Sequence, residues 1–148
     1  MRACIQRVKH ASVNVSGAVV GAIEHGMLVL LGVEHGDTRE DADYIIKKIT
    51  SLRIFEDKAG KMNLSLSDVQ GEILIISQFT LLGDARHGRR PSFSDAAAPD
   101  EANALYEYTA DTLARDFTVA RGVFGADMDV ELLNQGPVTL LLDSRKLF

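Results

Sequence analysis

Polar side chains follow directly on an apolar stretch at residues 73–76, at a place where a ligand could bind. The stretch predicts a buried strand, and Ser77, Gln78 and Thr80 come immediately after it. Ligands commonly bind at strand ends, and N–H groups that lose their strand partners there can stabilise an oxyanion. The same groups can also satisfy backbone ends in an ordinary turn, and the spacing alone favours that interpretation.

Gly136 and Pro137 form a second candidate, because they stand between two predicted strands. We expect residues 134–137 to turn the chain at this point. A peptide bond before proline is cis in about 5–6% of cases in folded proteins, typically in a tight turn. The alternative is a trans-proline loop that ends a strand, and the residues do not decide between the two.

The remaining chemistry-bearing residues match no familiar catalytic motif. The sequence has no nucleophile elbow, no phosphate-binding P-loop and no H-E-x-x-H pattern. We expect neither a metal nor another cofactor, because Cys4 has no partner cysteine and the histidines are not at ligand spacing. Cys4 is interpreted as a small core residue and the histidines as surface residues. The histidines are His10, His25, His35 and His87.

The charge distribution bears on nucleic-acid binding. The formal net charge is −5, which argues against a protein that binds nucleic acid of any sequence by neutralising many phosphates. A compact basic run nevertheless occurs at Arg86, His87, Arg89 and Arg90. It is either a solvated loop or a contact surface, and an enzyme that grips only the end of an RNA needs few phosphate contacts.

Length and composition are those of an ordinary globular protein. The chain has 148 residues, of which 46% are hydrophobic and 25% charged, so we expect one domain over residues 1–148. The single cysteine fits a reducing compartment. The residues after Met1 lack the apolar core of a signal peptide, and the apolar run at 27–31 is too short to span a bilayer. We therefore expect a cytoplasmic location.

The hydrophobic pattern predicts the elements that position these residues. Asp37, with Glu40 three residues later, predicts the capping box of a first helix, and a second is expected to begin near Pro99. Alternation and continuous apolar runs predict strands. These strands are expected near residues 13–15, 19–23, 27–33, 54–55, 73–76, 117–123, 128–133 and 138–142. The combination predicts an α+β fold whose mixed or antiparallel sheets curl into a barrel-like core with two main helices.

An ordered set of short segments resembles the D-aminoacyl-tRNA deacylases, also called D-tyrosyl-tRNA deacylases. The most specific are residues 77–81 (Ser-Gln-Phe-Thr-Leu) and 134–139 (Asn-Gln-Gly-Pro-Val-Thr). Further matching segments, in order along nearly the whole chain, are residues 6–8, 52–55, 88–93 and 124–128. One short motif would be weak evidence, but the ordered set is specific.

The resemblance implies an enzyme that hydrolyses the ester between a D-amino acid and the 3′-terminal adenosine of tRNA, and that also removes glycine from mischarged tRNA. It implies a homodimer with its active sites at the subunit interface. We expect no association with a membrane. The catalytic residues carried over are Ser77, Gln78, Phe79 and Thr80. The residues carried over to substrate binding are Gly136 and Pro137, as a cis pair that reaches into the partner's site, with Asn134 in the same motif and Arg7 as a support.

The implied chemistry is consistent with these residue types. An enzyme that selects D-amino acids and accepts many side chains must read the α-carbon, and rigid backbone groups suit that task. For catalysis, Thr80 could be a nucleophile, but no base is clearly paired with it. The alternative, which we favour, is that N–H groups near Phe79 and Thr80 stabilise the oxyanion while water attacks, helped by the tRNA 2′-hydroxyl.

Two other functions remain open at this point. One is a non-catalytic RNA- or DNA-binding protein that uses Arg86, Arg89 and Arg90. The other is an editing module for another mischarged amino acid on the same fold.

Overall fold

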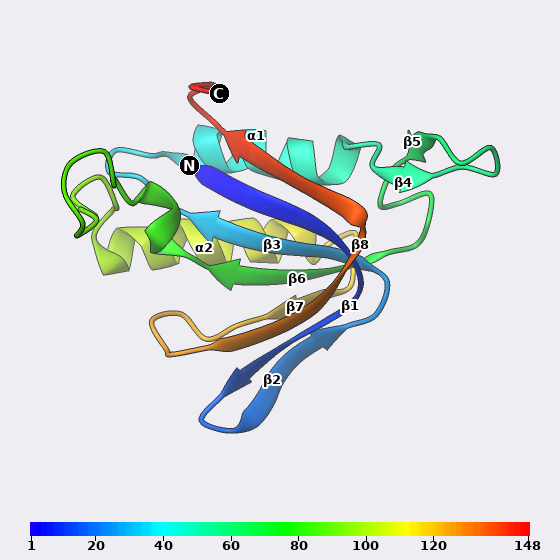
Figure 1. Cartoon of the computed structure of the whole chain (residues 1–148), viewed down its shortest axis with the longest axis horizontal. Coiled ribbons are helices and arrows are strands. Elements are labelled where there is room, and N and C mark those ends of the chain that lie inside the picture. The colour runs from blue at the N-terminus through cyan, green and yellow to red at the C-terminus, as the bar shows by residue number, and fades with distance from the viewer.

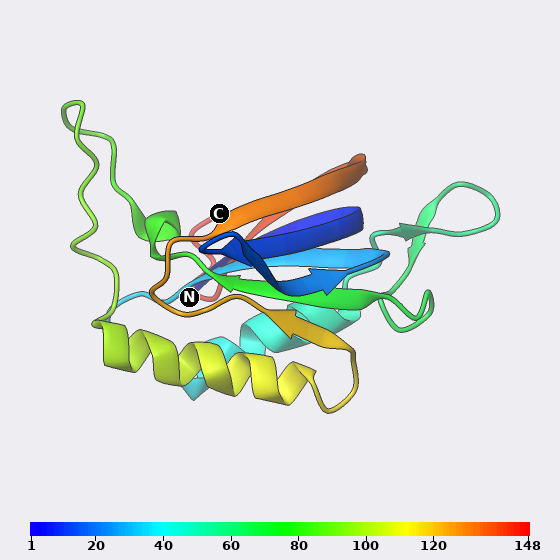
Figure 2. The same ribbon diagram turned by 90° about the horizontal axis from the view of Figure 1, so that it is seen from below.

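The computed structural model describes residues 1–148 as a strongly curled sheet with two helices packed on one face (Figures 1 and 2). The predicted α+β fold with a barrel-like sheet and two main helices is confirmed. Neither helix is long and apolar enough to cross a membrane. The elements are β1 (Arg2–Val15), β2 (Ala18–Ile23), β3 (Gly26–Gly32), α1 (Arg39–Ser51), β4 (Phe55–Glu56), β5 (Met62–Leu64), β6 (Glu72–Ser77), the 3-10 helix η1 (Phe79–Leu82), α2 (Pro99–Leu113), β7 (Val119–Arg121) and β8 (Asp129–Asp143).

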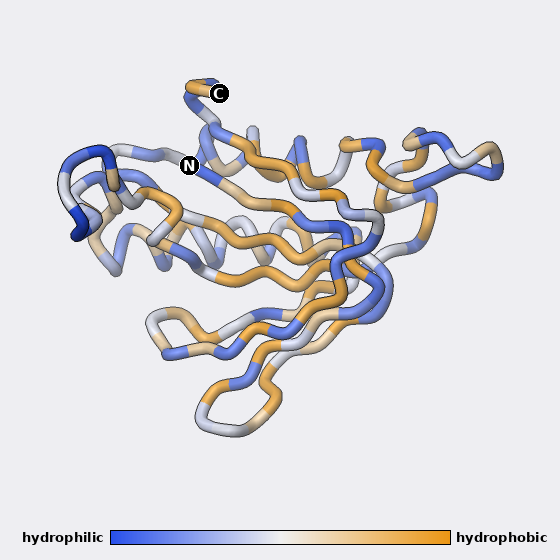
Figure 3. Tube along the Cα trace, in the orientation of Figure 1, coloured by the Kyte–Doolittle hydropathy of each residue, from blue (hydrophilic) through white to orange (hydrophobic).

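The main sheet has the strand order β2-β1-β3-β6-β7, and β8 also pairs with β1. The two outer strands approach each other, since a Cβ added to Gly21 of β2 would lie 2.7 Å from the carbonyl oxygen of Arg121 in β7. The central strands β3 and β6 run parallel, and both are apolar between their end residues, as Figure 3 shows. Both are buried on both faces, which explains their continuous apolar sequence.

Alternate residues of β3 and β6 face two separate cores. Met27 and Ile73 lie in the larger core, which α1 and α2 cover. Leu28 and Leu74 lie in the smaller core, on the other face, inside the curl of the sheet. Because side chains alternate along a strand, one pair of strands serves both cores.

Helix α1 begins one residue later than predicted. Thr38 is the N-cap, and its N–H donates to Oδ2 of Asp41 at 2.8 Å, which forms the capping box. Asp37 is not available as a cap because its carboxylate lies 2.7 Å from the buried amino group of Met1. A contact between the chain start and this loop therefore shifts the helix boundary.

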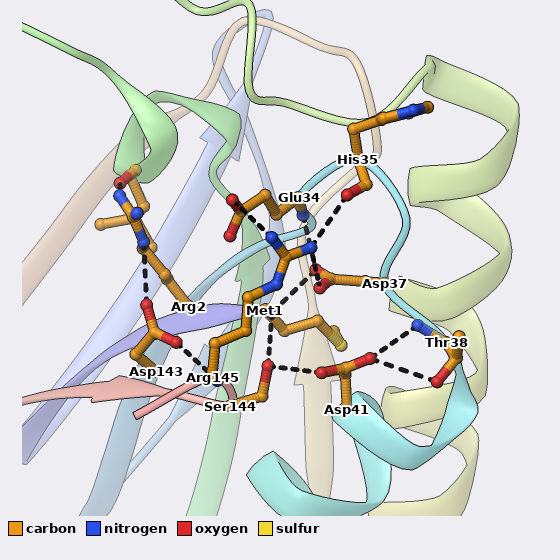
Figure 4. Close-up of polar contacts among 11 residues, drawn as sticks. Met1, Arg2, Glu34, His35, Asp37, Thr38, Asp41, Asp143, Ser144 and Arg145 are labelled. Carbon is orange, nitrogen blue, oxygen red and sulfur yellow. Dashed lines mark hydrogen bonds and ion pairs between the residues drawn. The ribbon is translucent and has the colours of Figure 1, made fainter. Parts of the chain in front are cut away.

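A polar cluster joins the first residues, the last residues and the loop before α1 (Figure 4). The amino group of Met1 donates to Oγ of Ser144 at 2.7 Å. Arg2 donates through Nε to Oδ2 of Asp143 at 3.2 Å and through Nη1 to the carbonyl of Leu81 at 3.2 Å. Through these two contacts Arg2 ties η1 to the end of β8.

The segment around Gly136 and Pro137 is not a turn between two strands, contrary to the sequence prediction. It is a bulge within the single long strand β8. Gln6 pairs with Thr139 and Val8 with Asn134, so Arg7 alone opposes residues 135–138. The bulge absorbs the extra residues, and both halves of β8 remain paired with β1.

The expectation of a cis bond before Pro137 is also wrong, because every peptide bond in the structure is trans. Gly136 adopts a φ of +112°, a conformation that L side chains rarely take. The change of direction is made by this glycine, so the chain needs no tight cis-proline turn.

Candidate active site

A cavity of about 500 Å³ opens beyond the carboxyl ends of β3 and β6. Ser77, Gln78 and Phe79 form one wall, which the chain makes because the apolar run of β6 stops abruptly at Ser77. Leu31 of β3 and Val33, just after β3, continue this wall, and most of the remaining lining is apolar. The cavity lies at the strand end where the sequence suggested a ligand site.

The start of η1 presents backbone donors at this wall. The N–H of Gln78 donates to the carbonyl of Leu31 at 2.7 Å, which fixes the chain as it leaves β6. Because η1 begins at Phe79, the N–H groups of Phe79 and Thr80 have no acceptor within the 3-10 helix. Two adjacent donors of this kind can stabilise an oxyanion.

Thr80 is exposed and does not line the cavity. Its Oγ1 accepts a short hydrogen bond from Nε2 of Gln78. A side-chain amide cannot take a proton from a hydroxyl group near neutral pH, so Gln78 does not activate Thr80 as a nucleophile. The hydroxyl group instead helps to orient the Gln78 side chain.

The other walls of the cavity come from residues for which no role was predicted. They are Ala96 and Ala97 before α2, Pro99, Ala102 and Tyr106 of α2, residues 124–128, and Val130 of β8. The only indication in the sequence was that residues 124–128 form one of the segments on which the family resemblance rests. These residues come mostly from loops, which have no periodicity to mark them.

Tyr106 is the most deeply buried polar side chain at the cavity. Its hydroxyl group donates to the carbonyl of Ile75 at 3.0 Å, and its ring lies 6.0 Å from that of Phe124. Burial raises the pKa of Tyr106 to about 12, so the residue is neutral at physiological pH. No group of three or more His, Cys, Asp or Glu side chains could hold a metal ion. Cys4 is half-buried in β1, where burial raises the pKa of its thiol.

The bulge of β8 is held by two residues singled out in the sequence. Nδ2 of Asn134 donates to the carbonyls of Arg7 at 3.0 Å and Val138 at 3.1 Å, so it spans the neck of the bulge. Nε of the buried Arg7 donates to the carbonyl of Gln135 at 3.1 Å. Arg7 also donates to the carbonyl of Ile54, while its contact with Glu56 is 3.5 Å long.

The cavity and the bulge lie apart within one chain. None of residues 134–138 lines the cavity, and Figures 1 and 2 show the bulge at the opposite end of the sheet from η1. Gly136 and Pro137 are exposed at the tip of the bulge. The two sequence motifs can act on one substrate only if the bulge comes from a second chain.

Comparison with known proteins finds many relatives of similar sequence. The family model described as D-Tyr-tRNA(Tyr) deacylase matches residues 4–143. The D-aminoacyl-tRNA deacylase of Thermosipho melanesiensis is 57% identical over 150 residues, and that of Anaeromyxobacter dehalogenans is 59% identical over 149; each match covers 100% of both chains.

Two solved structures have the same fold. One, described as c-Myc DNA Unwinding Element Binding Protein, has a TM-score of 0.91 at 39% identity and covers 97% of this chain and 98% of its own. The other, described as a probable eukaryotic D-amino acid tRNA deacylase, has a TM-score of 0.80 at 19% identity and covers 96% of this chain and 98% of its own. At that identity the second likeness concerns the fold alone.

Proposed function

The chain belongs to the D-Tyr-tRNA(Tyr) deacylase family, and from that membership we propose that it hydrolyses the ester bond of D-aminoacyl-tRNA and releases free tRNA and the D-amino acid. The observation that carries the proposal is the match of the family over residues 4–143 together with a cavity at Ser77, Gln78 and Phe79. A cytoplasmic location fits a substrate that is made where translation occurs.

The proposed reaction relies on backbone donors rather than on a side-chain nucleophile. The N–H groups of Phe79 and Thr80 stabilise the negative charge that develops on the carbonyl oxygen of the ester when water attacks the carbonyl carbon. The 2′-hydroxyl of the terminal adenosine relays the proton that the water loses to the departing 3′-oxygen, so that the free acid and the free 3′-hydroxyl are formed. Support comes from Thr80, whose hydroxyl group has an amide rather than a base as its partner.

Selection against L-aminoacyl-tRNA is proposed to come from the bulge of β8, with its trans Gly136-Pro137 bond. Backbone groups around Gly136 accept a bond from the α-amino group of the substrate and collide with an L side chain. A thousandfold preference requires about 4 kcal/mol, which a steric clash in a stiff site can supply. Glycyl-tRNA has no side chain to clash and is hydrolysed too.

A homodimer is proposed to bring the bulge of one subunit over the cavity of the other. The cavity is lined by no residue of its own chain's bulge. The sheet also exposes large apolar side chains that a partner would cover, among them Leu133 and Leu141 of β8. A complete site then forms only in the dimer. The activity per chain is therefore expected to fall when the protein is diluted below the dissociation constant of the dimer.

The decisive experiment is incubation with D-Tyr-tRNA and L-Tyr-tRNA, followed by measurement of the free tRNA released. Rapid hydrolysis of the D form and slow hydrolysis of the L form is the expected result. Equal rates, or no hydrolysis of the D form, would rule out the proposal. Competition between D-Tyr-tRNA and Gly-tRNA then distinguishes a chirality-based enzyme from an editing module devoted to another mischarged amino acid.

A second candidate function is DNA binding, favoured by the 39% identical relative described as a DNA unwinding element binding protein. Binding of duplex DNA without turnover of any aminoacyl-tRNA would favour it. A steep decrease in affinity with salt concentration is expected for such a complex.

A further inference from the structure

A basic hairpin loop rises from the rim of the cavity. Residues 85–91 form the loop, and both backbone hydrogen bonds between Asp84 and Ser92, of 2.8 and 2.9 Å, close its base. Cavity-lining residues flank it in the sequence, with Phe79 before it and Ala96 after it. Figure 2 shows the loop between η1 and α2, standing away from the body of the protein.

An aromatic pair anchors the loop to the cavity. The ring of Phe93, just beyond the loop, meets the ring of Phe79 edge-on with 5.2 Å between centroids. Phe79 is 57% exposed and also lines the cavity. The exposed ring lies between the cavity and the loop, where an unpaired base could stack on it.

The charges of the loop fall into two groups. Arg86 is engaged with Asp84 through two hydrogen bonds of 2.9 and 2.8 Å, and this partner holds the pKa of Asp84 down to about 2. Arg89 and Arg90 are exposed and form no ion pair. Arg86 therefore shapes the loop, while Arg89 and Arg90 leave two positive charges free at its tip.

Building on the function proposed above, we propose that Arg89 and Arg90 bind phosphates of the tRNA acceptor end while its 3′-terminal adenosine occupies the cavity. Each arm of the seven-residue loop reaches roughly 10 Å when extended. That length is about three stacked nucleotides at 3.4 Å each, enough to lead from the cavity to the start of the acceptor helix. Free arginine side chains beside an exposed aromatic ring are the usual means of holding a nucleic-acid strand.

An acidic overall charge makes these two side chains important. With a net charge of −5, the protein as a whole repels an RNA, so attraction has to come from a local positive surface. Arg89 and Arg90 provide it on a loop whose base adjoins the rim of the cavity. Contacts with phosphates do not depend on the nucleotide sequence. They therefore suit an enzyme that removes one type of error from many tRNAs.

The test compares Arg89→Ala/Arg90→Ala with the wild type and with Lys47→Ala/Arg115→Ala. The control removes two exposed charges from the helical side of the molecule, one within α1 and one just after α2. The ribbon shows both helices on one face of the sheet (Figure 2). Steady-state kinetics on D-Tyr-tRNA are measured over a range of salt concentrations. A second substrate, the 3′-D-tyrosyl ester of adenosine, lacks the rest of the tRNA.

The loop variant is expected to raise KM for D-Tyr-tRNA about tenfold or more at low salt, with kcat within about twofold. The slope of log KM against log salt concentration should fall by roughly 1.4 to 1.8, the value for two phosphate contacts. Hydrolysis of the adenosine ester should be unchanged. Arg89→Lys/Arg90→Lys should retain most of the affinity, because a point charge still binds phosphate.

Three outcomes would overturn the proposal. The first is a wild-type KM and salt slope in the folded loop variant, while the wild type hydrolyses D-Tyr-tRNA. The second is an equal loss on both substrates, which would make the loop part of the cavity structure. The third is loss of binding to duplex DNA with unchanged tRNA kinetics. A wild type inactive on both substrates would instead refute the proposed function, and this inference with it.

Discussion

Arg7→Ala is the substitution that best separates discrimination from catalysis. The Arg7 side chain is only 4% exposed and donates to the carbonyls of Gln135 and Ile54, one from the bulge and one from the chain before β4. Its substitution leaves the buried carbonyl of Ile54 and the partly buried carbonyl of Gln135 without these donors. Each such loss costs about 1–3 kcal/mol, so the free energy of unfolding should fall by about 2–6 kcal/mol. The contact with Glu56 adds little, since that carboxylate is half exposed.

A domain of this kind has a total stability of about 5–15 kcal/mol, so the variant should remain folded at low temperature. The bulge, however, loses the donor that holds the Gln135 carbonyl. If the bulge is the chiral gate, its clash with an L side chain weakens, and the ratio of kcat/KM for D-Tyr-tRNA over L-Tyr-tRNA should fall at least tenfold. That change corresponds to about 1.4 kcal/mol of lost discrimination.

The assay measures the free energy of unfolding in urea and the D/L ratio on the same preparation. Ile49→Ala is the matched control, because Ile49 is fully buried in α1 and its truncation costs about 2–5 kcal/mol without touching the bulge. The control should lose stability and keep its D/L ratio. If Arg7→Ala is destabilised to the same extent and also keeps the ratio, Arg7 has only a structural role and the argument about the gate fails.

Three further predictions test other parts of the structure. In Gly136→Ala the new Cβ overlaps Nη2 of Arg7, and the residue must adopt a φ of +112°. The melting temperature and the D/L ratio of kcat/KM should therefore both fall. A variant with both values unchanged would contradict a tightly fitted bulge. Thr80→Ala should keep kcat within about tenfold, whereas a trapped acyl-enzyme in the wild type, detected by mass spectrometry, would make Thr80 the nucleophile. Burial raises the pKa of Tyr106 from 10.0 to about 12. The unfolded chain therefore loses this proton first, the free energy of unfolding should fall as pH rises from about 10 to about 12, and Tyr106→Phe should flatten that fall.

The elements that the sequence predicted well are those whose signal is local. The apolar runs at 27–33 and 73–76 correspond to β3 and β6 within one residue at each end, because burial on both faces leaves a continuous apolar pattern. Pro99 marked the start of α2 because its missing N–H is harmless in a first turn. Ser77 was correctly predicted at a strand end because the apolar run stops there.

The features that the sequence did not reveal depend on partners far along the chain. Asp37 and Thr38 both fit a capping box, and the amino group of Met1 decides between them by engaging Asp37. Residues 134–137 have the composition of a turn, but the pairing of β1 with both halves of β8 keeps them in one strand. Most of the loop residues that complete the cavity carry no periodic pattern and are brought together only by the fold.

The position of Gly136 gives the strongest reason to treat the bulge as a functional part rather than a defect. A simple strand at this position would need neither a residue with a positive φ nor a buried arginine beneath it. Instead, the chain uses a glycine at φ +112°, both donors of Asn134 and a nearly fully buried guanidinium to hold four residues away from the sheet. Gly136 and Pro137, at the exposed tip, lose conformational entropy when they are ordered, with little burial of their own in return. A partner's substrate held against that tip would benefit from the rigidity, because the ordering has already been done before binding.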